Sequence, residues 1–300
     1  MKPTDPLLIV GADGSIGRAL AARLVSEGKP VIQTTRRLDT LSETRIFLDL
    51  TKEKEVEDWH PPCQVATAYL CAGVSSLEQC RTNPVQSVAV NVSNIVKLAK
   101  TLVASGTFVI FLSTNQVYDG SIPFRKAEEP VCPQTEYGRQ KAEAERQILV
   151  LDNLVSVVRF TKVLNSNMPL FQRWIQALDN HQSIHPFSDM VMAPLPISFA
   201  VDVLNRQAEV RLPGIVQVSG EKDVSYLEVA NYIAQQIGAS LDLVQSLRSK
   251  EADLQIESVP LHTTLDTSQM RVELGLESPD VWSAIHSAFS KNIRNNDRPN

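Results

Sequence analysis

A glycine-rich turn between a predicted strand and a predicted helix constrains the fold of this chain more than any other feature. Gly11, Gly14 and Gly17 follow the apolar run Leu7–Val10, and residues at helical spacing then continue over Ser15–Ser26. Such a turn lets the backbone approach a pyrophosphate closely and points the N–H groups of a helix N-terminus at negative charge. Glycines alone are weak evidence, because many turns need a residue with positive φ. Their position at the first βα junction predicts a dinucleotide-binding site.

The rest of the first half alternates β-rich runs with helical stretches. Further strands are predicted over residues 31–35, 45–48, 66–71, 107–112 and 154–160, with helices over 85–105 and 136–151. Strands alternating with helices form right-handed βαβ units, which predicts an α/β fold with a Rossmann-like, doubly wound parallel sheet. We expect a nucleotide-binding domain at 1–163 and a smaller, interleaved C-terminal substrate-binding region at 164–300. A segment near 193–220 is expected to return to the main sheet.

Composition excludes several classes of protein. Apolar residues make up 43% of the 300 and charged residues 21%, which is globular rather than disordered composition. The net charge of −5, without a long basic run, argues against nucleic acid as a partner. No segment has the roughly 20 uninterrupted apolar residues of a membrane span, and the N-terminus lacks a secretory pattern, so we expect a cytoplasmic protein. The four cysteines lack metal-ligand spacing, so free thiols and no metal site are expected.

The G-x-x-G-x-x-G spacing resembles that of the extended short-chain dehydrogenase/reductase superfamily. Two further segments match the cofactor shell of that superfamily. Asp49-Leu50 follows the third predicted strand, where the superfamily has an acid near the adenine, and Cys71-Ala72-Gly73 follows the fourth, where it has a small-residue turn beneath the cofactor. The resemblance therefore implies cofactor contacts from Gly11, Asp13, Gly14, Ser15, Ile16, Gly17, Asp49, Leu50, Cys71, Ala72 and Gly73.

The end of the second predicted strand bears on the choice between NAD(H) and NADP(H). NAD enzymes usually place Asp or Glu there for the ribose 2′-hydroxyl, whereas a nearby Arg accommodates a 2′-phosphate. This strand ends in Arg36-Arg37, and no acid follows until Asp39. Two guanidiniums suit bidentate phosphate recognition. We therefore expect NADP(H) to be preferred over NAD(H), with a solvated basic loop as the competing interpretation.

Tyr137 and Lys141 form a Y-x-x-x-K motif at the start of a predicted helix. Residues four apart project from one helix face, roughly 6 Å apart along the axis. The unperturbed pKa of a phenol is about 10, and a neighbouring ammonium and an oxidised nicotinamide ring both lower it. Tyr137 is therefore expected to protonate a carbonyl oxygen as hydride arrives, and Lys141 to hold the nicotinamide ribose. Without further context a surface pair is the default interpretation.

That context comes from residues 111–118, at the end of the fifth predicted strand. They resemble the superfamily's Ser/Thr-x-x-Val-Tyr/Phe motif, whose hydroxyl binds the substrate carbonyl; on that match Thr114, not Ser113, is catalytic. Sugar-nucleotide 4,6-dehydratases of the superfamily carry an Asp–Glu pair directly after this Thr, for acid–base removal of water. Asn115 and Gln116 stand there instead. Neither exchanges a proton usefully, which argues against a dehydratase.

Several polar residues have a structural interpretation beside the functional one. Phe160 follows the sixth predicted strand, where the superfamily wraps the nicotinamide, and is a predicted cofactor contact. Arg159, directly before it, either belongs to the same nicotinamide-wrapping segment or is a buried structural arginine. Asn91 matches a structural asparagine of the superfamily or is a satisfied polar residue of its helix. His181 and His185 have the spacing of one helix face, but we favour exposed polar histidines over metal ligands.

The closest resemblance is to the dTDP-4-dehydrorhamnose reductase branch, and it covers most of the chain. Residues 117–120, Val-Tyr-Asp-Gly, match its V-F-D-G pattern, and residues 189–194 resemble its D-Q-x-G-x-P segment, with Met190 and Met192 for Gln and Gly. The resemblance implies NADPH-dependent reduction of a 4-keto nucleotide sugar, with Thr114, Tyr137 and Lys141 as catalytic residues. The two methionines are apolar and adaptable, so a less polar carbonyl substrate stays open.

Two other functions stay open as alternatives. One is a non-catalytic NADP(H)-binding regulatory or scaffold subunit, which need not retain the Thr–Tyr–Lys set. The other is an NAD-dependent sugar-nucleotide epimerase, which usually has an acid after the second strand, so that Arg36 argues against it. Relatives often form homodimers through the helix of the Tyr–Lys motif, where Ala142, Ala144 and Ile148 either serve such an interface or face the core.

Overall fold

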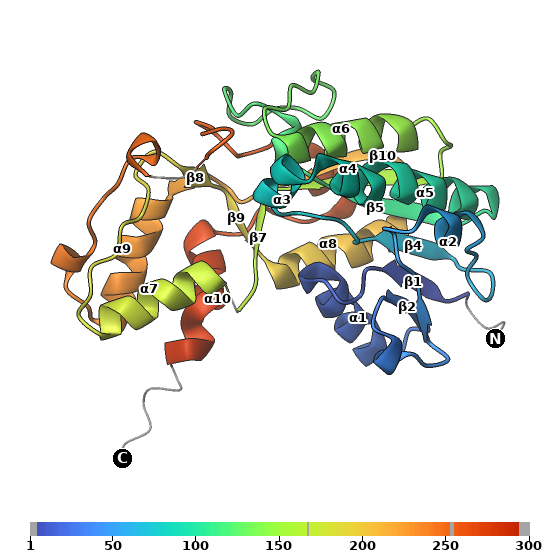
Figure 1. The fold of residues 1–300 in the computed structure, drawn as a ribbon, viewed down its shortest axis with the longest axis horizontal. Helices are drawn as coiled ribbons and strands as arrows, with labels where there is room; N and C mark the ends of the chain where they lie inside the picture. Colours follow the sequence, from blue (N-terminus) through green and yellow to red (C-terminus); the bar gives the residue numbers. More distant parts are fainter. Residues whose placement is uncertain (1–4, 167, 253–254, 294–300) are drawn as a thin grey trace, which may run out of the picture.

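A seven-stranded parallel sheet forms the centre of the protein. The computed structural model describes residues 5–166, 168–252 and 255–293 (Figure 1). The strand order is β10-β6-β5-β4-β1-β2-β3, with β1 (Leu7–Val10), β2 (Val31–Thr35), β3 (Arg45–Phe47), β4 (Thr67–Leu70), β5 (Phe108–Thr114), β6 (Val155–Phe160) and β10 (Gly214–Val218). The order reverses between β1 and β4, and α/β sheets bind ligands outside the carboxyl ends of their strands at such a point. The predicted Rossmann-like fold is confirmed.

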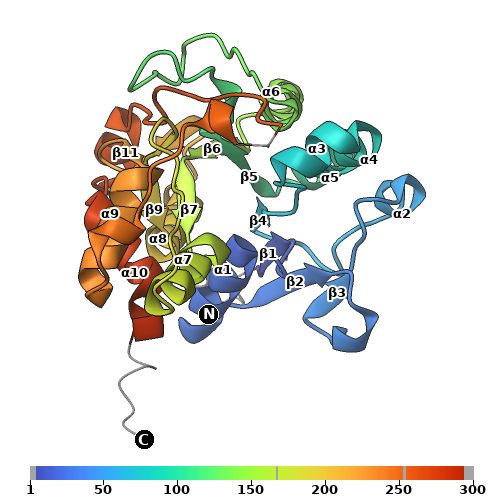
Figure 2. The same ribbon diagram turned by 60° about the vertical axis from the view of Figure 1, so that its left-hand side comes forward.

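Helices cover both faces of the sheet, as expected for a parallel sheet. Side chains alternate along β5, so that Val109 joins one hydrophobic core and Ile110 the other. Ala144 and Ile148 are fully buried in the first of these cores, which settles their role as core residues. Figure 2 shows the sheet between the two layers: α5 (Ile95–Ala104) and α6 (Glu136–Ile148) against one face, α1 (Ser15–Ser26) and α8 (Ile197–Val210) against the other.

A third core forms a smaller lobe beside the sheet, on the left in Figure 1. Its helices are α7 (Pro169–Asp179), α9 (Tyr226–Ile237) and α10 (Val281–Ile293), and two short sheets pair β7 (Lys162–Leu164) with β9 (Pro194–Pro196) and β8 (Val191–Met192) with β11 (Val224–Ser225). We call this region the small lobe. His181 and His185 lie after α7, which ends at Asp179, and both are exposed, so the favoured interpretation as exposed polar histidines is confirmed.

Short helical segments complete the chain. They are η1 (Leu38–Thr40), α2 (Glu53–Glu57), α3 (Leu77–Thr82), α4 (Pro84–Val88), η2 (Ala89–Asn94), η3 (Asn115–Val117), η4 (Leu241–Leu243), η5 (Ser249–Glu251) and η6 (Met270–Leu274). Within the described ranges, no helix is both long and apolar enough to cross a membrane. Nor do three or more His, Cys, Asp or Glu side chains gather there in a way that suits a metal ion.

The helix predicted over 85–105 is interrupted in the structure. Its middle, η2, is a π-helical turn between α4 and α5. Such single-turn bulges inside helices are frequent at functional sites. Here the bulge contains Asn91, whose buried side chain bonds to Val74 in the turn after β4 and to Gln140 on α6. The π-helical turn therefore positions the Asn91 side chain, which supports the candidate site described below.

Candidate active site

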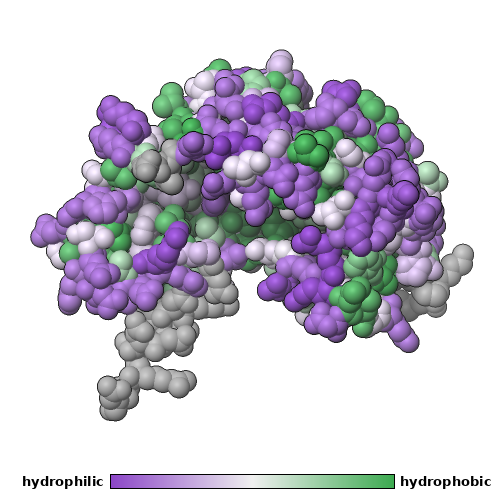
Figure 3. Space-filling model, in the orientation of Figure 1, coloured by the Kyte–Doolittle hydropathy of each residue, from purple (hydrophilic) through white to green (hydrophobic). Residues whose placement is uncertain are grey.

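A cavity of about 560 Å³ lies where the carboxyl ends of the strands meet the small lobe. Residues that directly follow β1, β4, β5 and β6 line one side of it, and Met190, Tyr226 and His262 are among those that line the other. Figure 3 shows the surface hollowed between the two parts of the molecule. The predicted site residues in its wall are Gly14, Ser15, Ile16, Gly17, Cys71, Ala72, Gly73, Thr114, Tyr137, Lys141 and Phe160.

The glycine turn has the geometry that its sequence predicts. Gly11 has a φ of +87°, and a Cβ there would lie 2.7 Å from the backbone of Ala72, so only glycine fits. Gly14 caps α1 without a side-chain hydrogen bond. The first N–H groups of α1 therefore face the cavity as donors, which is the arrangement that binds a pyrophosphate.

The three predicted catalytic residues come together from two elements. Thr114 ends β5, and its Oγ1 accepts a hydrogen bond from the Gln116 N–H at 3.2 Å. Tyr137 and Lys141 lie one turn apart on α6, whose start Thr135 caps by accepting from the Gly138 N–H at 3.0 Å. A Cβ on Gly138 would overlap the Gln116 carbonyl oxygen. Glycine at 138 thus lets α6 approach the turn after Thr114, and the motif search had missed it.

Burial sets the protonation of the tyrosine and the lysine. Desolvation raises the pKa of Tyr137, so the phenol stays protonated in this structure. The expected lowering of this pKa is not found, because the causes of the shift, burial first and then Cys80, both raise it. Lys141 is only 5% exposed, and burial lowers its pKa to about 7 although Glu145 acts in the opposite direction. Its Nζ lies 3.7 Å from the centroid of the fully buried Phe111 ring, a cation–π contact.

Arg159 is a buried structural arginine rather than a cofactor contact. It is 2% exposed and pairs with Glu145 at 2.7 Å. Glu145 stands four residues after Lys141 on α6, so this pair ties the catalytic helix to β6. Phe160 lies in the cavity wall beside it. Of these neighbours on β6, Arg159 therefore stabilises the fold, whereas Phe160 lines the cavity.

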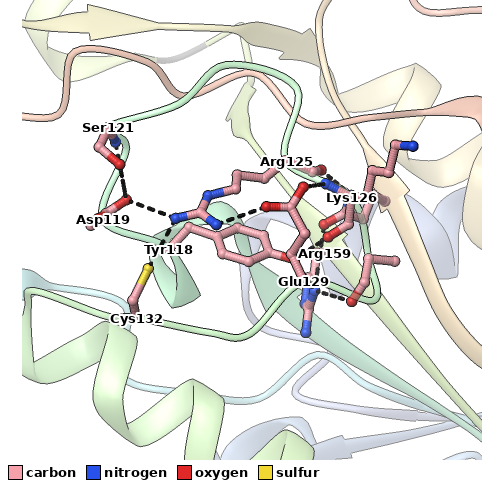
Figure 4. A network of polar contacts seen from close by, with 10 residues as sticks. Tyr118, Asp119, Ser121, Arg125, Lys126, Glu129, Cys132 and Arg159 are labelled. Carbon is pink, nitrogen blue, oxygen red and sulfur yellow. Dashed lines mark hydrogen bonds and ion pairs between the residues drawn. The ribbon is translucent and has the colours of Figure 1, made fainter.

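The loop after β5 is held over the cavity by a polar network (Figure 4). The Tyr118 ring lies between the guanidiniums of Arg125 and Arg159, at 5.5 and 5.2 Å. The Tyr118 hydroxyl donates to the Lys126 carbonyl at 2.7 Å, and Arg125 pairs with Glu129 at 2.7 Å. Each contact joins the loop to itself or to β6. The Val-Tyr-Asp-Gly motif thus builds a fixed rim for the cavity.

Asn91 supports the turn beneath the predicted cofactor site. Its Nδ2 donates to the Val74 carbonyl at 2.9 Å, and its Oδ1 accepts from the Val74 N–H at 2.8 Å. Cys71 opens this turn, and burial raises its pKa to about 12, so the thiol stays protonated. The side chain of Asn91 therefore replaces the backbone partners that an irregular turn lacks.

Six predicted cofactor residues are not part of the cavity wall: Gly11 and Asp13 of the glycine turn, and Arg36, Arg37, Asp49 and Leu50, which follow β2 and β3. Arg36 is exposed. Arg37 pairs with Asp13 at 2.5 Å. Asp49 accepts from the Thr51 N–H at 3.0 Å and from its hydroxyl at 2.9 Å. Leu50, also predicted as a cofactor contact, is buried at 5% exposure, and its side chain packs in the core rather than in the cavity.

The C-terminal part of the chain contributes residues that no motif had indicated. His262 lines the cavity, and its Nδ1 lies 3.4 Å from the Asp223 carboxylate. Asp223 also accepts from the Thr263 N–H at 2.8 Å, so it anchors the segment that carries this histidine. His262 N–H in turn donates to the Gly120 carbonyl at 2.9 Å. The rim loop and this segment thus close the cavity together.

Comparison with known proteins agrees with this arrangement. A dTDP-4-dehydrorhamnose reductase of Aggregatibacter actinomycetemcomitans is 25% identical over 304 residues, covering 96% of this chain and 98% of that protein. The crystal structure of dTDP-4-dehydrorhamnose reductase from Bacillus anthracis in complex with NADP has a TM-score of 0.83 at 18% identity, covering 96% and 98%. MoeE5 in complex with UDP-glucose and NAD has a TM-score of 0.81 at 22% identity, covering 97% and 99%. The two structural likenesses show the fold.

Together, fold, site and relatives define an NAD(P)-dependent oxidoreductase of the extended short-chain dehydrogenase/reductase type. The model of the family described as "RmlD substrate binding domain" matches residues 5–293. Because this match spans nearly the whole chain, the protein belongs to that family.

Proposed function

We propose that this protein is an NADPH-dependent carbonyl reductase that acts on a 4-keto nucleotide sugar, with Tyr137 as the acid. The observation that carries the proposal is that Thr114, Tyr137 and Lys141 line one cavity with the glycine turn at Gly14–Gly17. A relative with nearly full coverage is named a reductase of such a sugar. The wall of one cavity thus combines a pyrophosphate site with an acid–base set.

The cofactor preference rests on the adenosine end. The arginines after β2 suit a 2′-phosphate, and one structural neighbour is an NADP complex. When bound, the reduced nicotinamide supplies the hydride. We assign its pyrophosphate to the N-terminus of α1 and its nicotinamide half to the wall formed by Cys71, Gly73 and Phe160.

The side chains of the cavity supply the proton. Because burial raises the pKa of Tyr137, the phenol is protonated and is a donor for the carbonyl oxygen as charge develops there. The Thr114 hydroxyl donates to the same oxygen and orients the carbonyl. Lys141, with a pKa of about 7, exchanges its proton near neutral pH beside the tyrosine and binds the ribose hydroxyls. The rim and the small lobe exclude water from this reaction.

We also propose a division of labour along the chain. Residues 1–163 bind the cofactor, and 164–300 bind the substrate, although β10 from the second part joins the main sheet. Met190, Val191 and Met192 line the substrate side of the cavity. These apolar side chains favour a deoxygenated sugar carbon over a hydroxylated one. The family relative's substrate, dTDP-4-dehydrorhamnose, is accordingly the first compound to test.

The test is Tyr137→Phe, which removes the proposed proton and little else. We expect substrate-dependent NADPH consumption to fall by about 10²–10⁴-fold, while NADPH affinity in a fluorescence titration stays unchanged. Tyr232→Phe, a change in the small-lobe core, is the matched control and should leave both quantities as they are. Unchanged turnover in Tyr137→Phe would rule out this mechanism. A wild-type protein that binds NADPH but reduces no keto sugar would favour the regulatory-subunit alternative.

A further inference from the structure

Two arginines converge on the carboxylate of Asp13 at the carboxyl end of β2. Asp13 Oδ1 contacts the Nη2 atoms of both Arg37, at 2.5 Å, and Arg45. Its Oδ2 accepts from the Thr35 hydroxyl at 2.7 Å. Arg18 donates to the Asp13 carbonyl oxygen at 2.8 Å. Arg45 lies on β3 and belongs to no motif, so sequence analysis does not group it with Arg37 and Asp13.

The carboxylate contacts Thr35, the last residue of β2, and dinucleotide-binding folds read the cofactor ribose near the end of that strand. Asp13 lies in the glycine turn, between Gly11 and Gly14, and the Gly11 N–H donates to the Thr34 hydroxyl at 3.0 Å. This bond fixes the turn against the end of β2. In this fold the group at the end of the second strand discriminates between the 2′-hydroxyl and the 2′-phosphate. β2 has no acid at its end, but Asp13 of the glycine turn places a carboxylate there.

The arginines are held by other contacts as well. Arg45 Nε donates to the Thr40 hydroxyl at 3.1 Å and Nη1 to the Gln33 Oε1 at 3.1 Å. The Arg37 N–H donates to the Thr35 hydroxyl at 3.0 Å. The positions of Arg45 and of the Arg37 backbone therefore do not depend on Asp13 alone. A change that removes the charge of Asp13 therefore need not displace its partners.

The carboxylate is ionised at neutral pH. Burial by itself would raise its pKa, but the hydrogen bond from Thr35 and the guanidiniums of Arg37 and Arg45 hold the pKa of Asp13 below its usual value. An ionised carboxylate accepts a hydrogen bond from a ribose hydroxyl and repels a phosphate. One side chain thus acts in opposite directions on the two cofactors.

We propose that Asp13 is a specificity-determining residue that limits the preference for NADPH over NADH. Its carboxylate accepts the 2′-hydroxyl of NADH, and it competes with the 2′-phosphate of NADPH for Arg37 and Arg45. This inference rests on the proposed function, since it concerns the same cofactor site. The cofactor preference at the adenosine end then depends on one carboxylate and two guanidinium groups that act in opposite directions.

The test compares Asp13→Asn with wild type in fluorescence titrations with NADPH and with NADH. We expect the ratio of the two dissociation constants to move about tenfold toward NADPH, which corresponds to about 1.4 kcal/mol. Asp39→Asn removes an exposed carboxylate from η1 of the same loop and should leave the ratio unchanged. Because both affinities are measured on one preparation, partial unfolding of a variant does not imitate the shift.

The outcomes separate the two levels of the proposal. If wild type binds a cofactor and Asp13→Asn leaves the ratio unchanged, or moves it toward NADH, the role of Asp13 is overturned while the reductase proposal stands. A move toward NADH would mean that Asp13 only positions the arginines. If wild type binds neither NADPH nor NADH, the proposed function fails and the inference fails with it. An equal shift in Asp39→Asn would show a general charge effect and would also overturn it.

Discussion

The two ends of the proposed cofactor site use charge in different ways. At the catalytic end, Lys141 is 5% exposed and rests on the Phe111 ring, and Arg159 and Glu145 pair at 2% and 3% side-chain exposure. At the adenosine end, the Arg37 side chain is 55% exposed and pairs with Asp13. Both ends place a carboxylate beside a guanidinium. The surroundings, and not the residue types, differ.

Burial therefore decides what each pair contributes. An exposed pair is screened by water and salt and contributes little to stability, so its arginine is free to serve a ligand. A buried pair is costly to break, because the partner left behind is an unsolvated charge. The catalytic end is accordingly rigid and shifts pKa values, whereas the adenosine end is adjustable. Three changes test this contrast.

The largest effect is expected for Arg159→Met. It leaves Glu145 buried and unpaired, and we expect a loss of about 3–5 kcal/mol of unfolding free energy, measured by urea denaturation. Arg37→Met, which breaks the exposed counterpart, should cost about 1 kcal/mol or less. Similar losses for the two variants would contradict the contrast between the ends.

The second effect, which depends on pH, is expected for Lys141→Met. The pKa of Lys141 is about 7 when folded and about 10.4 when unfolded, so between these values the unfolded chain binds more protons. Wild-type stability relative to the variant should therefore rise with pH from about 7 to about 10, by at most about 1.4 kcal/mol per pH unit. Below the folded pKa both states of the wild type carry the proton, and the difference is flat.

Urea midpoints between these pH values measure that difference. Lys54→Met, a change of an exposed lysine on α2, is the matched control and should differ from wild type by an amount independent of pH. A pH-independent difference for Lys141→Met as well would show that the lysine is not desolvated when folded.

The smallest effect is expected for cofactor binding by Arg37→Met. At low salt the dissociation constant of NADPH should rise by about tenfold, or about 1.4 kcal/mol, with little change for NADH. Added salt should shrink the difference, because exposed charges are screened within about 10 Å at 0.1 M ionic strength. Fluorescence titrations at two salt concentrations measure it. A salt-independent loss for both cofactors would indicate a structural role for Arg37.

Local pattern was sufficient wherever one segment determines the geometry. The glycine turn needs only a strand, three glycines and a helix in order, and the observed α1 and β2 have the predicted bounds. Thr114, Tyr137 and Lys141 likewise follow from short motifs, and the structure brings them to one cavity. The end of β5 was predicted too early, at residue 112, because β5 extends to Thr114, where its pairing with β6 continues.

Contacts between distant segments were beyond such reasoning. Arg45 reaches Asp13 only because β3 pairs with β2 in a register that sets Arg45 opposite Gln33. His262 reaches the cavity through Asp223 and Gly120, from segments without hydrophobic periodicity. The helical spacing of His181 and His185 has a local explanation, since the chain leaves α7 at Asp179 and both histidines follow that helix. Tertiary packing decides the cases of Arg45 and His262.

The most direct measurement of the central claim follows the hydride itself. Wild-type protein is mixed with NADPH deuterated at the transferred position and with a 4-keto nucleotide sugar, and the product is examined by mass spectrometry. The account predicts one deuterium in the sugar for each NADPH oxidised, and loss of this transfer in Tyr137→Phe. An unlabelled sugar and unchanged NADPH, in a protein that binds both, would contradict it.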